Sequence, residues 1–297
     1  MTQQARVGFV GVGLMGHGMA ANILAKGHAL TILGHRNRAP VEDLVRKGPV
    51  EVKTAGEGAR ASDVVFLCVT GSPQVEALVR GKDGIAAAAR PGLIVADCST
   101  ADPNSTLALA AELGEKGAAF VDCPLSGTPT QAEAGELGAM IGADEQTYER
   151  LRPVVETWAK KVVRVGAVGD GHKMKLLNNF LAMGYAAIYA EALALAQKSG
   201  ITPQTFDSVL RGSRMDCGFY QTFFRWVLER DREAHKFTLV NAFKDMKYLE
   251  SMADAAGLAN PVGNAVKNSY ALAVAAGKGE DYVPMLSDFL AKANGAT

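Results

Sequence analysis

The chain has 297 residues, of which 48% are hydrophobic and 21% are charged, as in an ordinary globular protein. This length is more than one domain commonly needs and suits two. Thirty-one basic residues balance thirty-one acidic ones, and no run is rich in lysine or arginine. A surface for nucleic acid or for anionic membranes is therefore not expected.

The four cysteines (Cys68, Cys98, Cys123 and Cys217) are dispersed and form no CxxC pair. The five histidines form no cluster at metal-ligand spacing either. We therefore expect no bound metal, and thiols that are mostly buried in a reduced, cytoplasmic protein. The apolar stretch 180–190 is shorter than the ~20 residues of a membrane span and is bounded by polar residues, so no membrane segment is expected.

The first half of the chain alternates β-branched runs with helical stretches, which favours a parallel sheet of the Rossmann type. The predicted strands are 7–10, 30–33, 64–69, 93–96, 120–121, 139–142 and 162–165. The predicted helices are 14–26, 41–47, 74–79, 105–116 and 147–159.

The pattern changes after Gly166, where a long Ala-, Leu- and Met-rich helix is predicted over about 172–198. Thr202 is a candidate N-cap for the next helix, and the rest of the chain is helical with Gly and Pro between segments. The predicted fold class is α/β: a Rossmann-type N-terminal domain, residues 1–166, and an all-helical C-terminal domain, residues 167–297. The long interdomain helix joins the two.

A glycine-rich turn, Gly11-Val-Gly-Leu-Met-Gly16, directly follows the first predicted strand and opens the first helix. In this setting GxGxxG predicts a dinucleotide site. Gly11 permits the tight turn, Gly13 the approach of a pyrophosphate and Gly16 close packing of helix on strand. The turn residues Leu14 and Met15 are included in this predicted cofactor site.

The end of the second strand indicates which nicotinamide cofactor is bound. An NAD-selective site has an acidic residue there, whereas this chain has His35-Arg36-Asn37-Arg38. Guanidinium groups suit a 2′-phosphate, so NADP is favoured over NAD, although a solvated basic loop has the same composition. Val69, Thr70 and Thr100 lie just past the ends of other strands and are candidate cofactor contacts, or caps of the turns that follow.

Two further segments carry groups suited to chemistry. Ser126 and the amides of Gly127 and Thr128 form a donor-rich turn that suits a carboxylate. Lys175 and Asn179 are spaced i, i+4 near the start of the long helix and therefore project from one face. An exposed lysine beside a capping asparagine would give the same pattern.

Taken together, these segments resemble the β-hydroxyacid dehydrogenase family, which includes 3-hydroxyisobutyrate dehydrogenases and glyoxylate, succinic semialdehyde and tartronate semialdehyde reductases. The resemblance covers nearly the whole chain, from Gly8–Gly16 and Met19–Asn22, through 122–135 and 175–179, to Phe237 and Lys244-Asp245. The sequence departs from the usual pattern at Thr128, where a second glycine is common, at Asp170, and at Thr70-Gly71. The first departure leaves the substrate open.

The resemblance implies a role for each matching residue. Lys175 matches the catalytic lysine and Asn179 its helper, while Ser126, Gly127 and Thr128 match the substrate-anchoring turn. Thr100 matches a threonine near cofactor and substrate. Lys244, assigned here to the cofactor, and Asp245, assigned to the substrate, match a pair from the helical domain.

The predicted activity is hydride transfer between NADP(H) and a small β- or γ-hydroxyacid or semialdehyde, with Lys175 as general acid and base. The basic segment around Arg36 resembles the NADPH-dependent semialdehyde reductase branch of the family. The alternatives are an imine reductase-like NADPH enzyme and a non-catalytic dinucleotide-binding protein. Lys175 argues against both, because the relatives with those roles usually lack that lysine. The resemblance also implies a homodimer or homotetramer.

Overall fold

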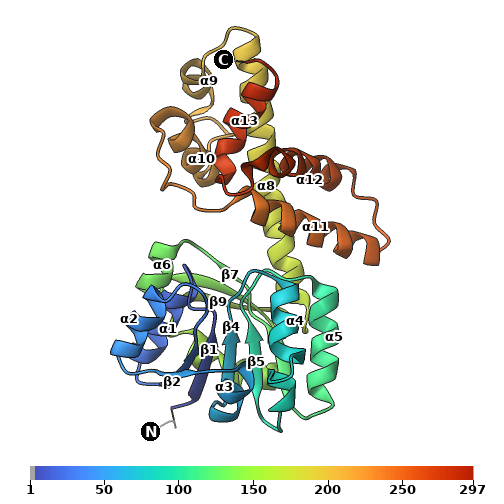
Figure 1. Ribbon diagram of the computed structural model, residues 1–297. Coiled ribbons are helices and arrows are strands. Elements are labelled where there is room, and N and C mark those ends of the chain that lie inside the picture. Colours follow the sequence, from blue (N-terminus) through green and yellow to red (C-terminus); the bar gives the residue numbers. More distant parts are fainter. Residues whose placement is uncertain (1–3, 297) are drawn as a thin grey trace. The chain divides into compact units, whose positions relative to one another are not determined.

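The computed structural model describes residues 4–296 and divides into two compact units, with the division at Lys175 and Leu176. Figure 1 shows a sheet with helices in the first unit and helices in the second. The predicted fold class is confirmed.

The first unit is built on a nine-stranded sheet in the order β3-β2-β1-β4-β5-β6-β8-β7, with β9 paired to β8. Pairs from β3 to β6 are parallel, and β8 runs antiparallel to β6 and β7. The predicted parallel sheet is thus present from β3 to β6, but the antiparallel pairing of β8 was not predicted. There Leu125 pairs back onto Ala139, so the chain reverses direction after β6. The strands are β1 Arg6–Val10, β2 Ala29–Leu33, β3 Val50–Val52, β4 Val64–Leu67, β5 Ile94–Asp97, β6 Ala119–Asp122, β7 Leu125–Ser126, β8 Leu137–Gly142 and β9 Ala159–Gly166.

Both faces of this sheet are covered, because successive side chains of a strand point to opposite faces. On β4, Val64 and Phe66 join one core, and Val65 and Leu67 join the other. The first core contacts α1 (Gly16–Ala25), α2 (Ala39–Arg46) and α7 (Glu145–Val155) and includes the fully buried Trp158. The second contacts α3 (Ala55–Ala61), α4 (Ser72–Arg80) and α5 (Pro103–Gly114). The short helix α6 (Pro129–Ala134) packs on α1.

Several predicted boundaries need correction. The first helix begins at Gly16 rather than at Leu14, because the residues before it form the glycine-rich turn. Helix α7 ends at Val155, and Ala159 already belongs to β9, where it pairs with Leu137. The short elements β3, α3, β7 and α6, each of seven residues or fewer, were not predicted from the sequence.

The second unit is helical, and residues 176–296 contain no strand, only an isolated bridge between Thr238 and Tyr282. Its core includes small residues of α8, among them Ala186 and Ala190, which allow other helices to approach closely. Thr202 caps its helix, as predicted, by accepting a hydrogen bond from the Thr205 amide. The helices are α8 Asp170–Lys198, α9 Pro203–Leu210, α10 Gly218–Glu229, α11 Leu239–Ala255, α12 Pro261–Ala273 and α13 Leu286–Ala293.

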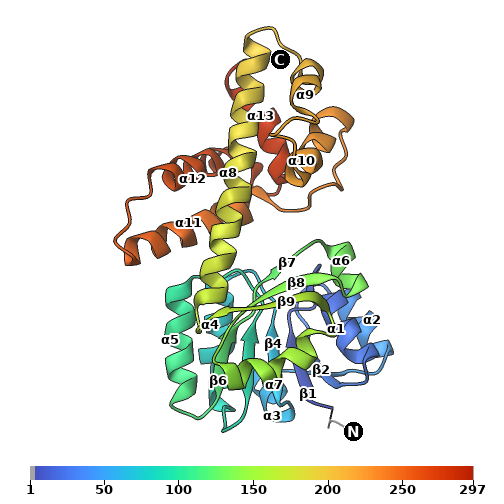
Figure 2. The same ribbon diagram turned by 180° about the vertical axis from the view of Figure 1, so that it is seen from behind.

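Helix α8 begins at Asp170, two residues before the predicted start, and continues to Lys198 (Figure 2). By length and composition it is the one helix of the described residues that could cross a membrane. However, 56% of its most apolar segment is buried inside the structure, and a core helix of a soluble protein meets the same two criteria.

Candidate active site

The carboxyl ends of β1, β4, β5 and β6 lie side by side along one edge of the sheet, because these neighbouring strands are parallel. Hydrogen bonds between the strand-end segments hold this edge together. The Cys68 amide donates to the Val10 carbonyl at 2.9 Å, and the Val69 amide donates to Ser99 Oγ at 3.0 Å. In an open α/β sheet such an edge carries the ligand crevice.

The glycine-rich turn follows β1 at this edge and fits a dinucleotide pyrophosphate. A Cβ at Gly11 would come within 2.2 Å of the Cys68 carbonyl oxygen, and one at Gly16 within 2.0 Å of the Gly11 carbonyl oxygen. A Cβ at Gly13, by contrast, would have no atom of the surrounding residues within 4 Å. Gly11 and Gly16 therefore serve the fold, and Gly13 leaves the helix terminus accessible. No side chain caps the start of α1, and its first turn has no acidic residue, so its amides can donate to phosphate oxygens.

The segment after β2 is exposed and holds His35, Arg36, Asn37 and Arg38. Arg38 is not free to turn toward a ligand, since its guanidinium makes two hydrogen bonds to Glu51 of β3, at 2.7 and 2.8 Å. This pair lowers the pKa of Glu51 through the hydrogen bond from Arg38. Arg36 has no ion pair among residues 4–296. Of the two arginines, Arg36 is therefore the one available to a 2′-phosphate.

The last residues of β5 and β6, Asp97 and Asp122, are buried carboxylates that were not singled out from the sequence. Asp122 is fully buried. Its carboxylate accepts hydrogen bonds from the amides of Gly169 and His172 at the start of α8, both at 2.7 Å. Burial raises the pKa of Asp122, although His172 and the two amides oppose the shift. A Cβ at Gly171 would lie 2.7 Å from the Asp122 carboxylate, so this glycine allows the close approach. The start of α8 is thereby fixed at the carboxyl end of β6.

His172, also fully buried, adds a second attachment to the same edge. Its Nδ1 lies 2.7 Å from Thr106 Oγ1, and its Nε2 lies 3.1 Å from the Ser99 carbonyl oxygen and 3.8 Å from Asp97 Oδ2. Ser99 precedes the predicted cofactor contact Thr100, and its hydroxyl holds the amide of Val69, just before Thr70. The predicted strand-end positions are thus tied through Ser99 and His172 to α8.

Ser126, Gly127 and Thr128 lie together on an exposed turn between β7 and α6. Gly127 has φ +129°, a left-handed conformation that favours glycine. Thr128 is engaged internally: it caps α6, and its amide donates to Gln131 Oε1 at 2.9 Å. The Thr128 amide, predicted to be a donor for a carboxylate, thus already has an acceptor within its own helix in this arrangement.

The second unit holds a buried polar group on α8 and α11. Asn179 Nδ2 donates to Asp245 Oδ2 at 2.7 Å, and Lys244 Nζ lies 3.1 Å from Asp245 Oδ1. Asp245 is 1% exposed. Lys244 also lies over the ring of Tyr248, 5.3 Å from its centroid. The predicted helper Asn179 and the predicted pair Lys244-Asp245 are therefore in direct contact. Lys175 is one turn before Asn179 on α8, at the division between the units.

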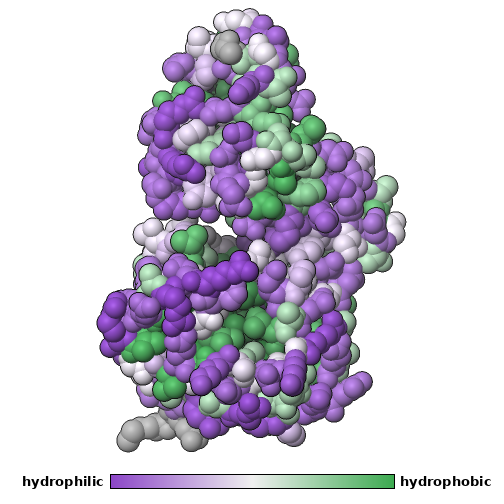
Figure 3. Space-filling view, viewed as in Figure 1, coloured by the Kyte–Doolittle hydropathy of each residue, from purple (hydrophilic) through white to green (hydrophobic). Residues whose placement is uncertain are grey.

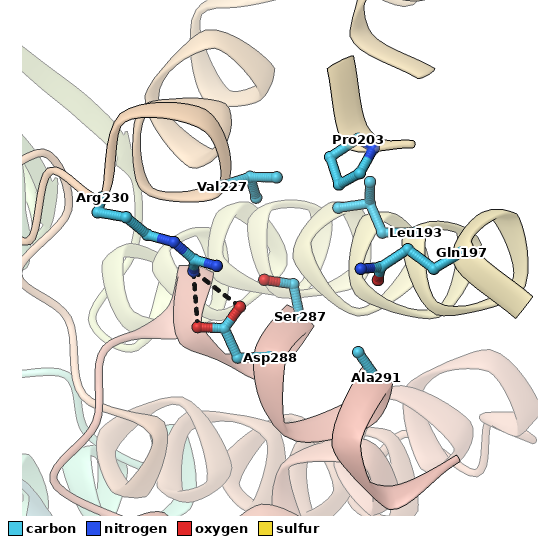
Figure 4. A pocket seen from close by; sticks show the side chains of 8 residues that line it. All are labelled: Leu193, Gln197, Pro203, Val227, Arg230, Ser287, Asp288 and Ala291. Carbon is cyan, nitrogen blue, oxygen red and sulfur yellow. Dashed lines mark hydrogen bonds and ion pairs between the residues drawn. The ribbon is translucent and has the colours of Figure 1, made fainter. Parts of the chain in front are cut away.

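Other features of the described residues lie outside this set. A small pocket in the second unit is lined by α8 to α10 and α13 and contains the Arg230–Asp288 pair (Figure 4). It holds none of the predicted site residues. No group of three or more His, Cys, Asp or Glu within residues 4–296 is arranged to bind a metal. Burial raises the pKa of the Cys68 thiol to about 12, which keeps it protonated.

Two family models together match most of the chain. The NAD binding domain of 6-phosphogluconate dehydrogenase matches residues 6–166, and the NAD-binding model of NADP-dependent 3-hydroxyisobutyrate dehydrogenase matches residues 169–287. The two matches meet between 166 and 169, whereas the compact units divide at 175. The two boundaries differ because the first residues of α8 contact the sheet and therefore belong to the first compact unit.

Individual proteins of the same kind are also similar. The chain is 35% identical to 2-(hydroxymethyl)glutarate dehydrogenase of Eubacterium barkeri over 71% of its own length and 69% of the relative's. It is 36% identical to 2-hydroxy-3-oxopropionate reductase of Escherichia coli (strain K12), over 70% of each. The solved structure of 3-hydroxyisobutyrate dehydrogenase from Mycobacterium tuberculosis with L-serine is 27% identical, with a TM-score of 0.86 over 97% of this chain and 99% of that one.

Proposed function

This chain belongs to the β-hydroxyacid dehydrogenase family and is an oxidoreductase of that type, and we propose that it transfers hydride between NADP(H) and a small β- or γ-hydroxyacid or semialdehyde. The observation that carries this proposal is the attachment of the first turn of α8 to the sheet edge. Asp122 and His172 anchor that turn beside the strand ends that follow the glycine-rich turn. Lys175 lies one turn further along the same helix.

In this proposal each residue has a defined task. When bound, a nicotinamide dinucleotide supplies or accepts the hydride. Lys175 gives a proton to the oxygen of the carbonyl group during reduction and takes the hydroxyl proton during oxidation. Ser126 and the adjacent Gly127 amide hold the substrate carboxylate. Asn179 is a positioning residue, because its amide nitrogen is committed to Asp245.

Lys175→Ala tests the catalytic role. We expect turnover to fall by about 10²–10⁴-fold, the usual contribution of a general acid or base, with nearly unchanged binding of NADPH. Lys173→Ala is the matched control, because Lys173 is on the same turn of helix and pairs with Asp170 at 3.0 Å on the surface. Equal loss of activity in both variants, or loss of cofactor binding in Lys175→Ala, would contradict a catalytic lysine.

The substrate class is tested by following the absorbance of NADPH with glyoxylate, succinic semialdehyde and tartronate semialdehyde, and with NADH in parallel. The similarity to a 2-hydroxy-3-oxopropionate reductase supports including this last aldehyde class. Turnover of a cyclic imine in preference to all three would favour the imine reductase alternative. Cofactor binding without turnover of any of these compounds would favour a non-catalytic binding protein.

The preference for NADP rests on Arg36. No acidic residue ends β2, since Gly34 follows Leu33. A Cβ at Gly34 would lie 2.7 Å from Arg38 and 2.8 Å from Glu51, so an acidic side chain there would displace their ion pair. The pair thus disfavours the arrangement that selects NAD.

Arg36→Ala tests this preference through the dissociation constants of NADPH and NADH. A charge-assisted contact of about 1.5–3 kcal/mol predicts about 10- to 150-fold weaker NADPH binding and unchanged NADH binding. Arg46→Ala removes the same charge from an exposed position on α2 and is the control. An equal effect on both cofactors would exclude a contact specific to the 2′-phosphate.

We also propose that the chain forms a homodimer or homotetramer through α8. Five large apolar side chains of α8 lie on one side of the helix and are 44–69% exposed: Leu177, Leu181, Tyr185, Ile188 and Leu195. Figure 3 shows one face of the surface, on which hydrophobic areas lie among hydrophilic ones in both units. Leu181→Glu should produce a monomer in light scattering, whereas Val209→Glu, at an apolar residue on α9 that is 71% exposed, should not. A monomeric wild type would overturn the proposal.

A further inference from the structure

The imidazole of His17 is held between carboxylates of two different helices. Its Nδ1 lies 2.7 Å from Glu133 Oε1 of α6, and its Nε2 lies 2.9 Å from Asp43 Oδ2 of α2. A neutral imidazole has one N–H and can donate to one of these acceptors, whereas the imidazolium can donate to both. The side chain is 20% exposed, so water screens these contacts only in part. The geometry therefore selects the protonated form.

The charged groups around His17 make Glu133 depend on it. Asp43 has two further cationic partners, Arg46 of α2 at 3.4 Å and Lys47, the C-cap of α2, at 2.6 Å. Glu133 has no other ion pair within residues 4–296. Burial lowers the pKa of His17, but the hydrogen bonds to Glu133 and Asp43 outweigh burial and leave that pKa raised above 6.5. Loss of the proton would leave Glu133 without a cationic partner, whereas Asp43 would keep Lys47 and Arg46.

Helix α6 is docked on α1 by contacts that surround this ion pair (Figures 1 and 2). Asn22 Nδ2 lies within hydrogen-bonding distance of the carbonyl oxygens of Ala132 at 3.0 Å and Glu133 at 3.1 Å. A Cβ at Gly18 would come within 2.5 Å of the α6 backbone, so the two helices touch along their main chains. Because α6 has only six residues, it is not stable as an isolated helix and depends on this docking.

The position of α6 sets the position of the turn before it. Thr128 is the N-cap of α6, and its reciprocal hydrogen bonds with Gln131 make the cap and the first turn one unit. Ser126 and Gly127 directly precede this cap. On its other side, α1 begins at the glycine-rich turn. The His17 contact therefore links the helix that receives the cofactor phosphates to the helix that carries the turn for the substrate carboxylate.

We propose that His17 is a positioning residue for substrate binding: its imidazolium fixes α6 against α1 and thereby places the 126–128 turn. This inference rests on the proposed role of that turn in binding a carboxylate. When His17 loses its proton at high pH, Glu133 loses its cationic partner, α6 becomes less firmly docked, and KM for the carboxylate substrate rises. The proton transfer at Lys175 does not involve His17, so kcat should change little from this cause.

The test compares KM, kcat and hydrogen exchange in α6 across pH, with Glu133→Gln and His17→Lys as variants. In the wild type we expect KM to rise about 2- to 5-fold as pH passes through the His17 pKa, as for loss of a partly exposed ion pair. Protection of the 131–135 amides, corrected for intrinsic exchange, should fall over the same range. Glu133→Gln should show the higher KM and the lower protection at all pH values.

Two controls separate this role from general effects of charge. Glu136→Gln removes the same charge three residues further along, from a side chain that pairs with Lys160 rather than with His17, and should behave as the wild type. His17→Lys keeps a cation between the carboxylates and should restore protection of α6 to higher pH. A flat KM in the wild type, or the same pH profile in Glu133→Gln, would overturn the proposal.

The exchange measurement also distinguishes failure of this inference from failure of the proposed function. If no carboxylate substrate is turned over, the proposed function fails, while a pH-dependent protection of α6 that Glu133→Gln abolishes would still show the docking contact. If turnover occurs and α6 protection does not depend on His17, the function stands and the positioning role is excluded.

Discussion

An Asp122→Ala substitution would remove the carboxylate that joins the end of β6 to the start of α8. Asp122 accepts two amide hydrogen bonds, both 2.7 Å long, and its side chain is fully buried. A hydrogen bond to a charged group contributes about 1.5–3 kcal/mol. Burial disfavours the carboxylate, as the raised pKa indicates, and this cost offsets part of the gain. We therefore expect a loss of about 3–4 kcal/mol in the free energy of unfolding of the first unit.

The two tryptophans allow the assay to follow the first unit separately. Trp158 is fully buried in the first unit, and Trp226 belongs to the second. In a Trp226→Phe background, fluorescence during urea unfolding reports on Trp158. Asp144→Ala is the matched control, because Asp144 caps α7 from an exposed position and should contribute only about 1 kcal/mol. If Asp122→Ala costs no more than Asp144→Ala, the anchoring of α8 by this carboxylate is refuted.

Three further predictions follow from single contacts. Gly18→Ala should raise substrate KM and lower the unfolding midpoint, since its methyl group would approach the α6 backbone to 2.5 Å; an unchanged KM would contradict the tight docking. Tyr270→Phe should lower the stability of the second unit by about 1 kcal/mol, because the hydroxyl donates to the Met183 carbonyl at 2.9 Å in the core; calorimetry would measure it. Burial lowers the pKa of His235 from 6.5 to about 4, so the stability that this residue contributes above pH 6.5 should be lost as the pH falls toward 4. His235→Phe should abolish this loss, as measured by unfolding followed through the fluorescence of Trp226.

The sequence was sufficient to predict those elements that have either a long apolar pattern or a motif with a known binding mechanism. GxGxxG after a strand predicted the turn at the end of β1, and the apolar run before Lys198 predicted the long helix. The short helices were missed, although both carry a local signal. Thr54 caps α3 by accepting the Glu57 amide, and Thr128 forms a capping box with Gln131. A search for Thr-x-x-Glu and Thr-x-x-Gln would have identified both starts.

The parts that the sequence could not reveal are contacts between distant residues. Nothing near Arg38 indicates that Glu51, on the neighbouring strand, occupies its guanidinium. In the sequence, Asp122 is only the residue that follows a predicted strand. Its role in fixing the start of α8 depends on amides 47 and 50 positions later in the chain. His17 lies next to the motif that was recognised, but its two carboxylates come from helices that start 22 and 112 residues after it. Local pattern cannot specify such partners, because packing of the sheet brings them together.

The hydrogen bonds between Asp122 and the start of α8 determine where the dinucleotide-binding part of this chain can be cut. A fragment that stops at Gly166 would keep the Asp122 carboxylate in the interior but lose both amides that donate hydrogen bonds to it. It would also lose the His172 ring, which lies beside Ser99. Such a fragment would carry an uncompensated buried charge and should aggregate or bind cofactor weakly. A fragment that continues to Lys175 retains every one of these groups. Engineered exchanges of the N-terminal part between relatives should therefore be joined after the first turn of the long helix rather than before it.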